Sequence, residues 1–279
     1  MFLKGCTLRC PWCCNPEAIS WDPQPYYVAR KCILPDPAPK RDLRSPYHER
    51  GQDGGCPNDG RNAGCKKWAA KACPTGACGV FGRWLDLHEI LGEVTPDVAY
   101  YRASGGGVTL SGGEPLAHQR VADLLHALKS EGLHVAVETS LAVKKEALLA
   151  TLPFVDLYLV DVKVLDPFVF REVLGGDLEL YLANVELLVS RGCKVLPRAP
   201  LVRPYNFSAS HGAALADFLR RFGLREVEVF SVHDLAKEKY EALGWPVPAF
   251  EVIEDEELAR FAANLASSSG AAVTVLEWS

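Results

Sequence analysis

Residues 105–139 read GGGVTLSGGEPLAHQRVADLLHALKSEGLHVAVET, and this stretch predicts a strand, a helix and a second strand in that order. Val108–Leu110 and Val135–Thr139 are short runs rich in β-branched residues, as strands are. Between them, four apolar residues recur at the spacing of one helix face: Val121, Leu124, Leu125 and Leu128. Such a unit predicts two parallel strands joined by a right-handed crossover.

The same alternation continues toward the end of the chain. Further strands are predicted at Leu157–Lys163, Lys194–Ala199, Val227–Val232 and Ala272–Glu277. Helical spacing recurs at Leu215, Phe218, Leu219 and Phe222, and again at Leu258, Phe261, Ala262 and Leu265. We therefore expect an α/β fold with a parallel sheet, either doubly wound or a full or partial barrel, whose chemistry lies at the carboxyl ends of the strands.

Polar residues stand at or just beyond the ends of these strands. They are Ser111-Gly112-Gly113-Glu114-Pro115, Glu138-Thr139-Ser140, Asp161-Val162-Lys163, Arg198 and His233. Any one of these segments alone could have only a structural role. Gly-Gly-Glu is often just a turn, and an isolated Arg or His is more often structural than catalytic. Since the carboxyl ends of parallel strands share one edge, we expect the five segments to converge on one rim.

Composition narrows the classes of function. With 279 residues, 48% of them apolar, the chain can bury a good core, and its net charge of −5 argues against a nucleic-acid partner. Asp156 and Asp161 interrupt the apolar run Phe154 to Val164 well before it reaches membrane-spanning length. Met1 to Cys6 contains no apolar signal region. We expect a cytoplasmic protein with no membrane partner.

The ten cysteines are unevenly distributed, since nine fall between Cys6 and Cys78 and only Cys193 lies beyond. In a mid-sized chain without a signal peptide, this pattern favours metal binding over disulfides. It predicts a first part of the core at 1–22, a cysteine-rich insert at 23–83 with a short helical piece around Lys66–Ala72, and the remainder of the core at 84–279. The insert has almost no periodicity, so it needs a metal to hold it together.

Cys6-Thr-Leu-Arg-Cys10-Pro-Trp-Cys13 has the spacing C-x3-C-x2-C, so three thiolates can wrap one cluster. Electron-transfer clusters are usually capped by four cysteines, so three ligands leave one iron open to bind something else. The alternative is a zinc knuckle or a group of buried thiols. Zinc would need a fourth ligand close by, and Cys14 adjoins Cys13 too tightly to serve comfortably.

The string FLKGCTLRCPWCCNPE at residues 2–17 resembles the signature of radical S-adenosylmethionine (SAM) activating enzymes for glycyl radical enzymes. This group includes the pyruvate formate-lyase and hydroxyphenylacetate decarboxylase activating enzymes. The resemblance implies a partial (β/α)6 TIM-like barrel and a catalytic 4Fe–4S cluster on Cys6, Cys10 and Cys13. SAM on the open iron would be cleaved to a 5′-deoxyadenosyl radical that abstracts a hydrogen from a glycine of the partner enzyme, with an electron from a flavodoxin or ferredoxin-type donor.

The resemblance continues over nearly the whole chain. The residues that match the family's SAM-contacting positions are Gly112, Gly113, Glu114, Glu138, Thr139, Ser140, Asp161, Lys163, Arg198 and His233. The Gly-Gly-Glu segment would hold the SAM amino group, and Lys163 would face the SAM carboxylate. In some members, the residues that correspond to Glu138, Thr139 and Asp161 would also surround a monovalent cation. The chain departs from the family at Leu141 and Ala236, where relatives have glycine, and at Phe170, where many have histidine.

Longer members of this family carry one or two auxiliary clusters in the insert. Cys73-Pro74 resembles the last ligand segment of bacterial ferredoxins, although their C-x2-C-x2-C-x3-C spacing is absent. Five cysteines suffice for one four-iron cluster and leave one spare. We expect one auxiliary 4Fe–4S cluster on Cys56, Cys65, Cys73 and Cys78, with Cys32 as the competing fourth ligand.

Two other functions compete with the activating enzyme. One is a radical SAM epimerase or dehydrogenase that acts on a small molecule or peptide, with Cys193 or Cys14 as hydrogen donor. Cys193 has the plainer reading of a buried core thiol. The other is a ferredoxin-like electron carrier, which is disfavoured because it leaves the polar segments at the strand ends unused.

Overall fold

The computed structural model describes residues 1–32, 73, 75–232 and 236–276. Seven strands form one sheet in the order β1-β4-β5-β6-β7-β8-β9, and every neighbouring pair is parallel. The strands are β1 (Phe2–Leu3), β4 (Gly107–Gly112), β5 (His134–Thr139), β6 (Leu157–Asp161), β7 (Val195–Leu201), β8 (Glu226–Ser231) and β9 (Ala272–Val275). The α/β class and the partial barrel are therefore confirmed.

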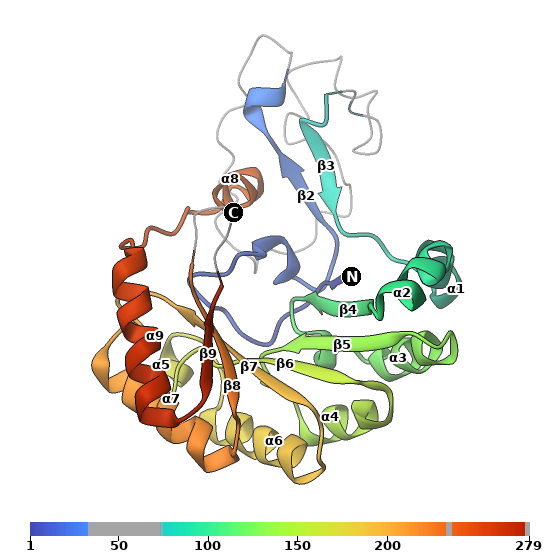
Figure 1. The fold of residues 1–279 in the computed structure, drawn as a ribbon. Helices are drawn as coiled ribbons and strands as arrows, with labels where there is room; N and C mark the ends of the chain where they lie inside the picture. The colour runs from blue at the N-terminus through green and yellow to red at the C-terminus, as the bar shows by residue number, and fades with distance from the viewer. Residues whose placement is uncertain (33–72, 74, 233–235, 277–279) are drawn as a thin grey trace.

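Helices cover the outer face of the curved sheet (Figure 1). They are α1 (Leu87–Val94), α2 (Val98–Ser104), α3 (Val121–Ser130), α4 (Lys145–Thr151), α5 (Pro167–Glu172), α6 (Leu178–Ser190), α7 (Ala209–Phe222) and α9 (Asp255–Ser269). A further helix, α8 (Lys237–Leu243), contacts the short 3-10 turn η1 (Pro16–Ala18) instead. Since β1 and β9 end the strand order, the barrel is open between them.

The apolar periodicity of the sequence corresponds to the buried faces of the helices. Leu124, Leu125 and Leu128 of α3 are buried against the sheet, and the equivalent faces of α7 and α9 are buried as well. The strand bounds differ slightly from those expected. The structure ends β6 at Asp161, two residues earlier, and extends β7 to Leu201.

The two ends of the cysteine-rich insert pair with each other. Strand β2 (Gln24–Tyr27) runs antiparallel to β3 (Cys78–Phe81), and this hairpin projects from the barrel in Figure 1. Cys56, Cys65 and the helical piece expected around Lys66–Ala72 lie outside the described residues. No helix in the described part of the chain has the length and apolar character needed to cross a bilayer.

Candidate active site

A cavity of about 440 Å³ opens at the carboxyl ends of the strands, beside the cysteine loop that follows β1. The predicted site residues that line it are Cys6, Cys10, Cys13, Gly112, Gly113, Glu138, Thr139, Ser140, Asp161, Lys163 and Arg198. His233 lies outside the described residues, although Ser231 and Val232 just before it line the cavity. The structure thus brings these segments together, and the SAM contacts assigned to them stay predictions.

The cysteine loop (residues 5–19) is tied down at its base and in its middle. The N–H of Gly5 donates to Ala18 O at 2.8 Å and closes the base of the loop. The N–H of Arg9 donates to Leu174 O at 2.9 Å, and Leu8 beside it is buried in the barrel core. The backbone around the first two cysteines is therefore fixed by contacts that leave their side chains at the cavity.

The three thiols of the loop are partly buried, and a backbone N–H donates to the first of them. The N–H of Leu8 donates to Cys6 Sγ at 3.4 Å. Burial raises the pKa of Cys10 to about 11 and that of Cys13 to about 12, and the neighbouring cysteines raise both further. Free thiols here would stay protonated at neutral pH, whereas a bound metal takes the thiolate and releases the proton.

The donor set suits an iron–sulfur cluster. Among the residues that the structure describes, no three His, Cys, Asp or Glu side chains lie close enough together to enclose a single metal ion. Three thiols from one loop nevertheless face one cavity, and thiolates are the ligands of iron–sulfur clusters. Backbone N–H groups directed at the sulfurs, as at Cys6, are a further feature of such sites.

The glycines at the end of β4 allow the cysteine loop to approach closely. A Cβ on Gly113 would lie 2.1 Å from Gly5 O, and Gly112 has a φ of +122°, which side chains disfavour. The N–H of Gly113 donates to Leu3 O at 2.8 Å. The two glycines therefore permit contact between the strand end and the loop that carries the cysteines.

Glu114 lies behind the cavity wall, with its carboxylate directed into the protein. Its two oxygens accept from Thr139 Oγ1 at 2.7 Å, Ser140 N at 2.7 Å and Ser140 Oγ at 2.5 Å. The N–H of Leu116 donates to it as well, at 3.1 Å. Burial raises the pKa of Glu114, and these hydrogen bonds oppose that rise. Glu114 thus joins the ends of β4 and β5 and fixes the turn at Thr139 and Ser140.

Lys163 and Asp161 form an ion pair on the cavity wall, with Nζ and Oδ2 2.7 Å apart. Burial works against the charged lysine, but the adjacent Asp161 raises the pKa of Lys163 well above its ordinary value. The ammonium group therefore stays charged. Asn206 holds the backbone here, because its Nδ2 donates to Lys163 O at 2.5 Å.

Arg198 lies between two carboxylates. Its Nη1 donates to Glu138, whose Oε2 accepts from Ser111 Oγ at 2.5 Å. Its Nε lies 2.9 Å from Glu228 Oε2, which is ion-pair distance without hydrogen-bond geometry. Phe230 packs under the guanidinium at 5.3 Å. Sequence reasoning missed Glu228, although it follows from register, since Arg198 and Glu228 are direct partners on β7 and β8.

The turn after β5 holds Leu141, at a position where the family resemblance leads us to expect glycine. Leu141 has a φ of +52° and is fully buried. Its N–H donates to Thr139 Oγ1 at 2.9 Å, and Asn184 of α6 donates to Leu141 O at 3.0 Å and to Val143 O at 2.8 Å. The side chain in the core and these hydrogen bonds offset the cost of the left-handed backbone.

The cysteines proposed as alternative hydrogen donors differ in position. Cys14 lines the cavity. Cys193 comes just before β7, at the amino end of the strand, whereas the cavity lies at the carboxyl ends. The position of Cys193 away from the cavity therefore does not favour its suggested role as a hydrogen donor.

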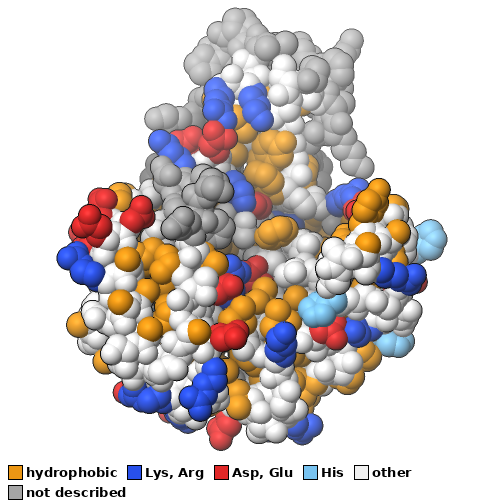
Figure 2. All heavy atoms as spheres, in the orientation of Figure 1, with side chains coloured by type: hydrophobic (Ala, Val, Ile, Leu, Met, Phe, Trp, Pro, Cys, Tyr) orange, Lys and Arg blue, Asp and Glu red, His pale blue; other side chains and the backbone are white. Residues whose placement is uncertain are grey.

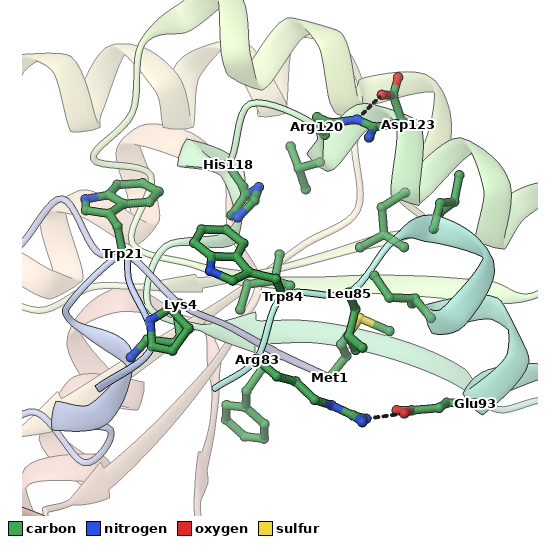
Figure 3. A pocket seen from close by; sticks show the side chains of 17 residues that line it. Met1, Lys4, Trp21, Arg83, Trp84, Leu85, Glu93, His118, Arg120 and Asp123 are labelled. Atoms are coloured by element: carbon green, nitrogen blue, oxygen red, sulfur yellow. Dashed lines mark hydrogen bonds and ion pairs between the residues drawn. The ribbon is translucent and has the colours of Figure 1, made fainter. Parts of the chain in front are cut away.

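A second cavity, of about 380 Å³, lies beside β1 and contains none of the predicted site residues (Figure 3). Trp21 and His118 face each other there, with ring centroids 6.3 Å apart. Four of its charged side chains are paired, Arg83 with Glu93 and Arg120 with Asp123, while Lys4 donates to Glu17 O and Gln24 Oε1. Figure 2 shows acidic and basic side chains interspersed over the face of the molecule that it draws.

Known proteins resemble the chain over most of its length, although no known family model matches it. The benzylsuccinate synthase activating enzyme of Thauera aromatica is 34% identical over 88% of this chain and 76% of that protein. The pyruvate formate-lyase 2-activating enzyme of Escherichia coli is 31% identical over 99% of this chain and 85% of that protein. A solved domain of a pyruvate-formate lyase-activating enzyme from Bacteroides vulgatus has a TM-score of 0.52 and 25% identity, covering 62% of this chain and 100% of that one.

The open parallel barrel, the three-cysteine loop and the polar cavity together define a radical SAM enzyme, a class whose cofactors are a 4Fe–4S cluster and SAM. Within this class, the sequence is more than 30% identical to two activating enzymes over most of their length. The chain belongs to the family of activating enzymes of glycyl radical enzymes. This confirms the family that the cysteine motif predicted, and the epimerase and electron-carrier alternatives are not favoured.

Proposed function

We propose that Cys6, Cys10 and Cys13 hold a 4Fe–4S cluster with one iron left for SAM, and that this chain activates a glycyl radical enzyme. The observation that carries the proposal is the cavity that these thiols share with residues of five neighbouring strands, β4 to β8. When bound, the cluster and SAM supply a one-electron cleavage that yields a 5′-deoxyadenosyl radical. The cavity walls would exclude water from the bound group while a glycine of the partner gives up its hydrogen.

The charged side chains of the cavity suit the two ends of an amino acid. Lys163 remains charged and can meet a carboxylate, while the backbone of Gly112 and Gly113 can meet an amino group. Glu138 and Asp161, which pair with Arg198 and Lys163, would form the proposed monovalent cation site together with Thr139. His233 completes the proposed set.

We also propose one auxiliary 4Fe–4S cluster, with Cys56, Cys65, Cys73 and Cys78 as ligands and Cys32 as the competing fourth ligand. Cys73 supports this proposal. Hydrogen bonds from the Thr75 hydroxyl and from backbone N–H groups, including that of Cys78, lower its pKa to about 7. A thiolate stabilised by N–H donors is the form that binds iron.

The partner and the electron donor are proposed by class. Activating enzymes of unlike glycyl radical enzymes match this chain at similar identity, from 34% for the benzylsuccinate synthase activator to 28% for the indoleacetate decarboxylase activator. The partner is therefore a glycyl radical enzyme whose substrate these identities do not assign. The donor is a flavodoxin or ferredoxin-type protein.

The proposal is tested by anaerobic reconstitution, followed by iron counting and an assay for 5′-deoxyadenosine under dithionite. With one auxiliary cluster we expect about eight irons per chain, and about four without it. Cys13→Ala should lose the cluster and the product, whereas the adjacent control Cys14→Ala should keep both. A glycyl doublet on a partner enzyme by electron paramagnetic resonance establishes the substrate class. 5′-Deoxyadenosine formed without that doublet on any glycyl radical enzyme would indicate a small-molecule substrate instead.

A further inference from the structure

Helix α8 contacts the cysteine loop from a point more than two hundred residues further along the chain. The hydroxyl of Tyr240 donates to Cys13 O at 3.0 Å. Nζ of Lys239 donates to Cys14 O at 3.2 Å and to Asn15 Oδ1 at 2.9 Å. The peptide groups that follow the third cysteine of the motif are thus held by two neighbouring side chains of one helix.

Both side chains are held in place and protonated, so each can remain a hydrogen-bond donor to the cysteine loop. Tyr240 is buried, and burial raises its pKa, so the hydroxyl keeps its proton. Its ring packs edge-on against Trp245, with centroids 6.4 Å apart. Lys239 is fixed on its other side by Glu17, whose Oε1 lies 2.6 Å from Nζ. The two donors therefore keep their positions relative to the loop.

One of these contacts bears directly on a cluster ligand. The carbonyl of Cys14 and the N–H of Asn15 belong to the same peptide group, and in a trans peptide they point in opposite directions. Lys239 holds the carbonyl, and the N–H of Asn15 faces Cys13 Sγ, where it opposes the rise in pKa that burial gives this thiol. A cation at the carbonyl oxygen also polarises the peptide and strengthens its N–H as a donor.

We propose that Lys239 and Tyr240 are positioning residues that hold the Asn15 N–H on the Cys13 sulfur, and that they thereby set the reduction potential and the retention of the cluster. This inference rests on the proposed cluster at Cys6, Cys10 and Cys13. Hydrogen bonds to cluster sulfurs stabilise the added negative charge of the reduced state, so they raise the potential. Helix α8 therefore tunes the electron-accepting group without touching SAM.

The test is a redox titration of the reconstituted full chain, in which the signal that responds to SAM is followed by electron paramagnetic resonance. In Lys239→Met we expect the ratio of reduced to oxidised cluster, at the wild-type midpoint potential, to fall about 3- to 10-fold. Tyr240→Phe should show a smaller fall in the same direction, and Lys239→Arg should restore most of the wild-type ratio. Iron release to a chelator should be faster in both weakened variants.

Two matched variants separate positioning from other effects. Lys237→Met removes the same charge from α8, at a residue that lines a small cavity together with Cys13. Tyr158→Phe also deletes a buried hydroxyl, but one that bonds Thr151 at 3.1 Å. Both should keep the wild-type ratio to within about twofold.

Equal shifts in Lys237→Met and Lys239→Met would overturn the proposal, because charge alone would then explain them. Wild-type potential and iron release in both Lys239→Met and Tyr240→Phe would overturn it too. If Lys239→Met takes up no iron while Lys237→Met does, the role in cluster retention is supported. The effect on the reduction potential is then measured on Tyr240→Phe. Wild-type protein without a cluster would instead refute the proposed function, so the two failures are distinguishable.

Discussion

Replacing Glu114 by glutamine tests how the turn after β5 is held. Each carboxylate oxygen accepts from a backbone N–H, one from Leu116 and the other from Ser140. A glutamine must place its NH2 group against one of these N–H groups in either orientation, because a backbone N–H only donates. One buried N–H is then unsatisfied and a charge-assisted bond is lost, which together cost about 3 kcal/mol of unfolding free energy.

The assay is urea unfolding of Glu114→Gln beside the control Glu172→Gln, an exposed glutamate of α5. The control should change the unfolding free energy by less than about 0.5 kcal/mol. SAM binding by the reconstituted Glu114→Gln protein should weaken as well, since Thr139 and Ser140 line the cavity. Equal stability of the two variants would show that the Glu114 carboxylate does not hold this turn.

Three further predictions concern other residues. Glu228→Gln removes a carboxylate beside Arg198 and should weaken SAM binding about tenfold, as measured by isothermal calorimetry. The control Glu226→Gln changes an exposed residue and should bind SAM as wild type does. Equal affinities of the two variants for SAM would contradict this prediction. Leu141→Gly relieves the strain of a left-handed backbone but removes a fully buried side chain. Thermal unfolding should therefore show a net loss of about 2 kcal/mol of unfolding free energy. A variant more stable than wild type would disprove this prediction. Burial lowers the pKa of His211 from 6.5 to about 4, so the unfolded chain takes up the proton first as the pH falls. Between pH 6.5 and 4, the unfolding free energy of wild type should therefore fall by about 3 kcal/mol more than that of His211→Gln. Identical losses of unfolding free energy in urea would count against this.

The parallel barrel could be predicted because its signals are local. Strands such as β4 and β5 are short β-rich runs, and α3 shows a clear apolar face. The rim followed from strand order, because polar residues after parallel strands must share one edge. The insert gave no such signal, since its pairing of β2 with β3 joins residues more than fifty positions apart.

The remaining features of the site depend on contacts between distant segments. The inward orientation of Glu114 requires the hydroxyls and N–H groups of the β5 turn, which only the folded chain brings to it. Lys239 and Tyr240 lie far from Cys13 in sequence, and no periodicity links them. Leu141 contradicts the local preference for glycine because burial in the core and Asn184 outweigh it.

The proposed cluster at Cys6, Cys10 and Cys13 leaves one iron for SAM. Electron–nuclear double resonance of the reduced protein with SAM labelled by 15N at its amino group measures this directly. We predict a hyperfine coupling between the cluster and the labelled nitrogen, both in wild type and in Cys14→Ala. A cluster whose spectrum shows no nitrogen coupling and does not respond to SAM would contradict it.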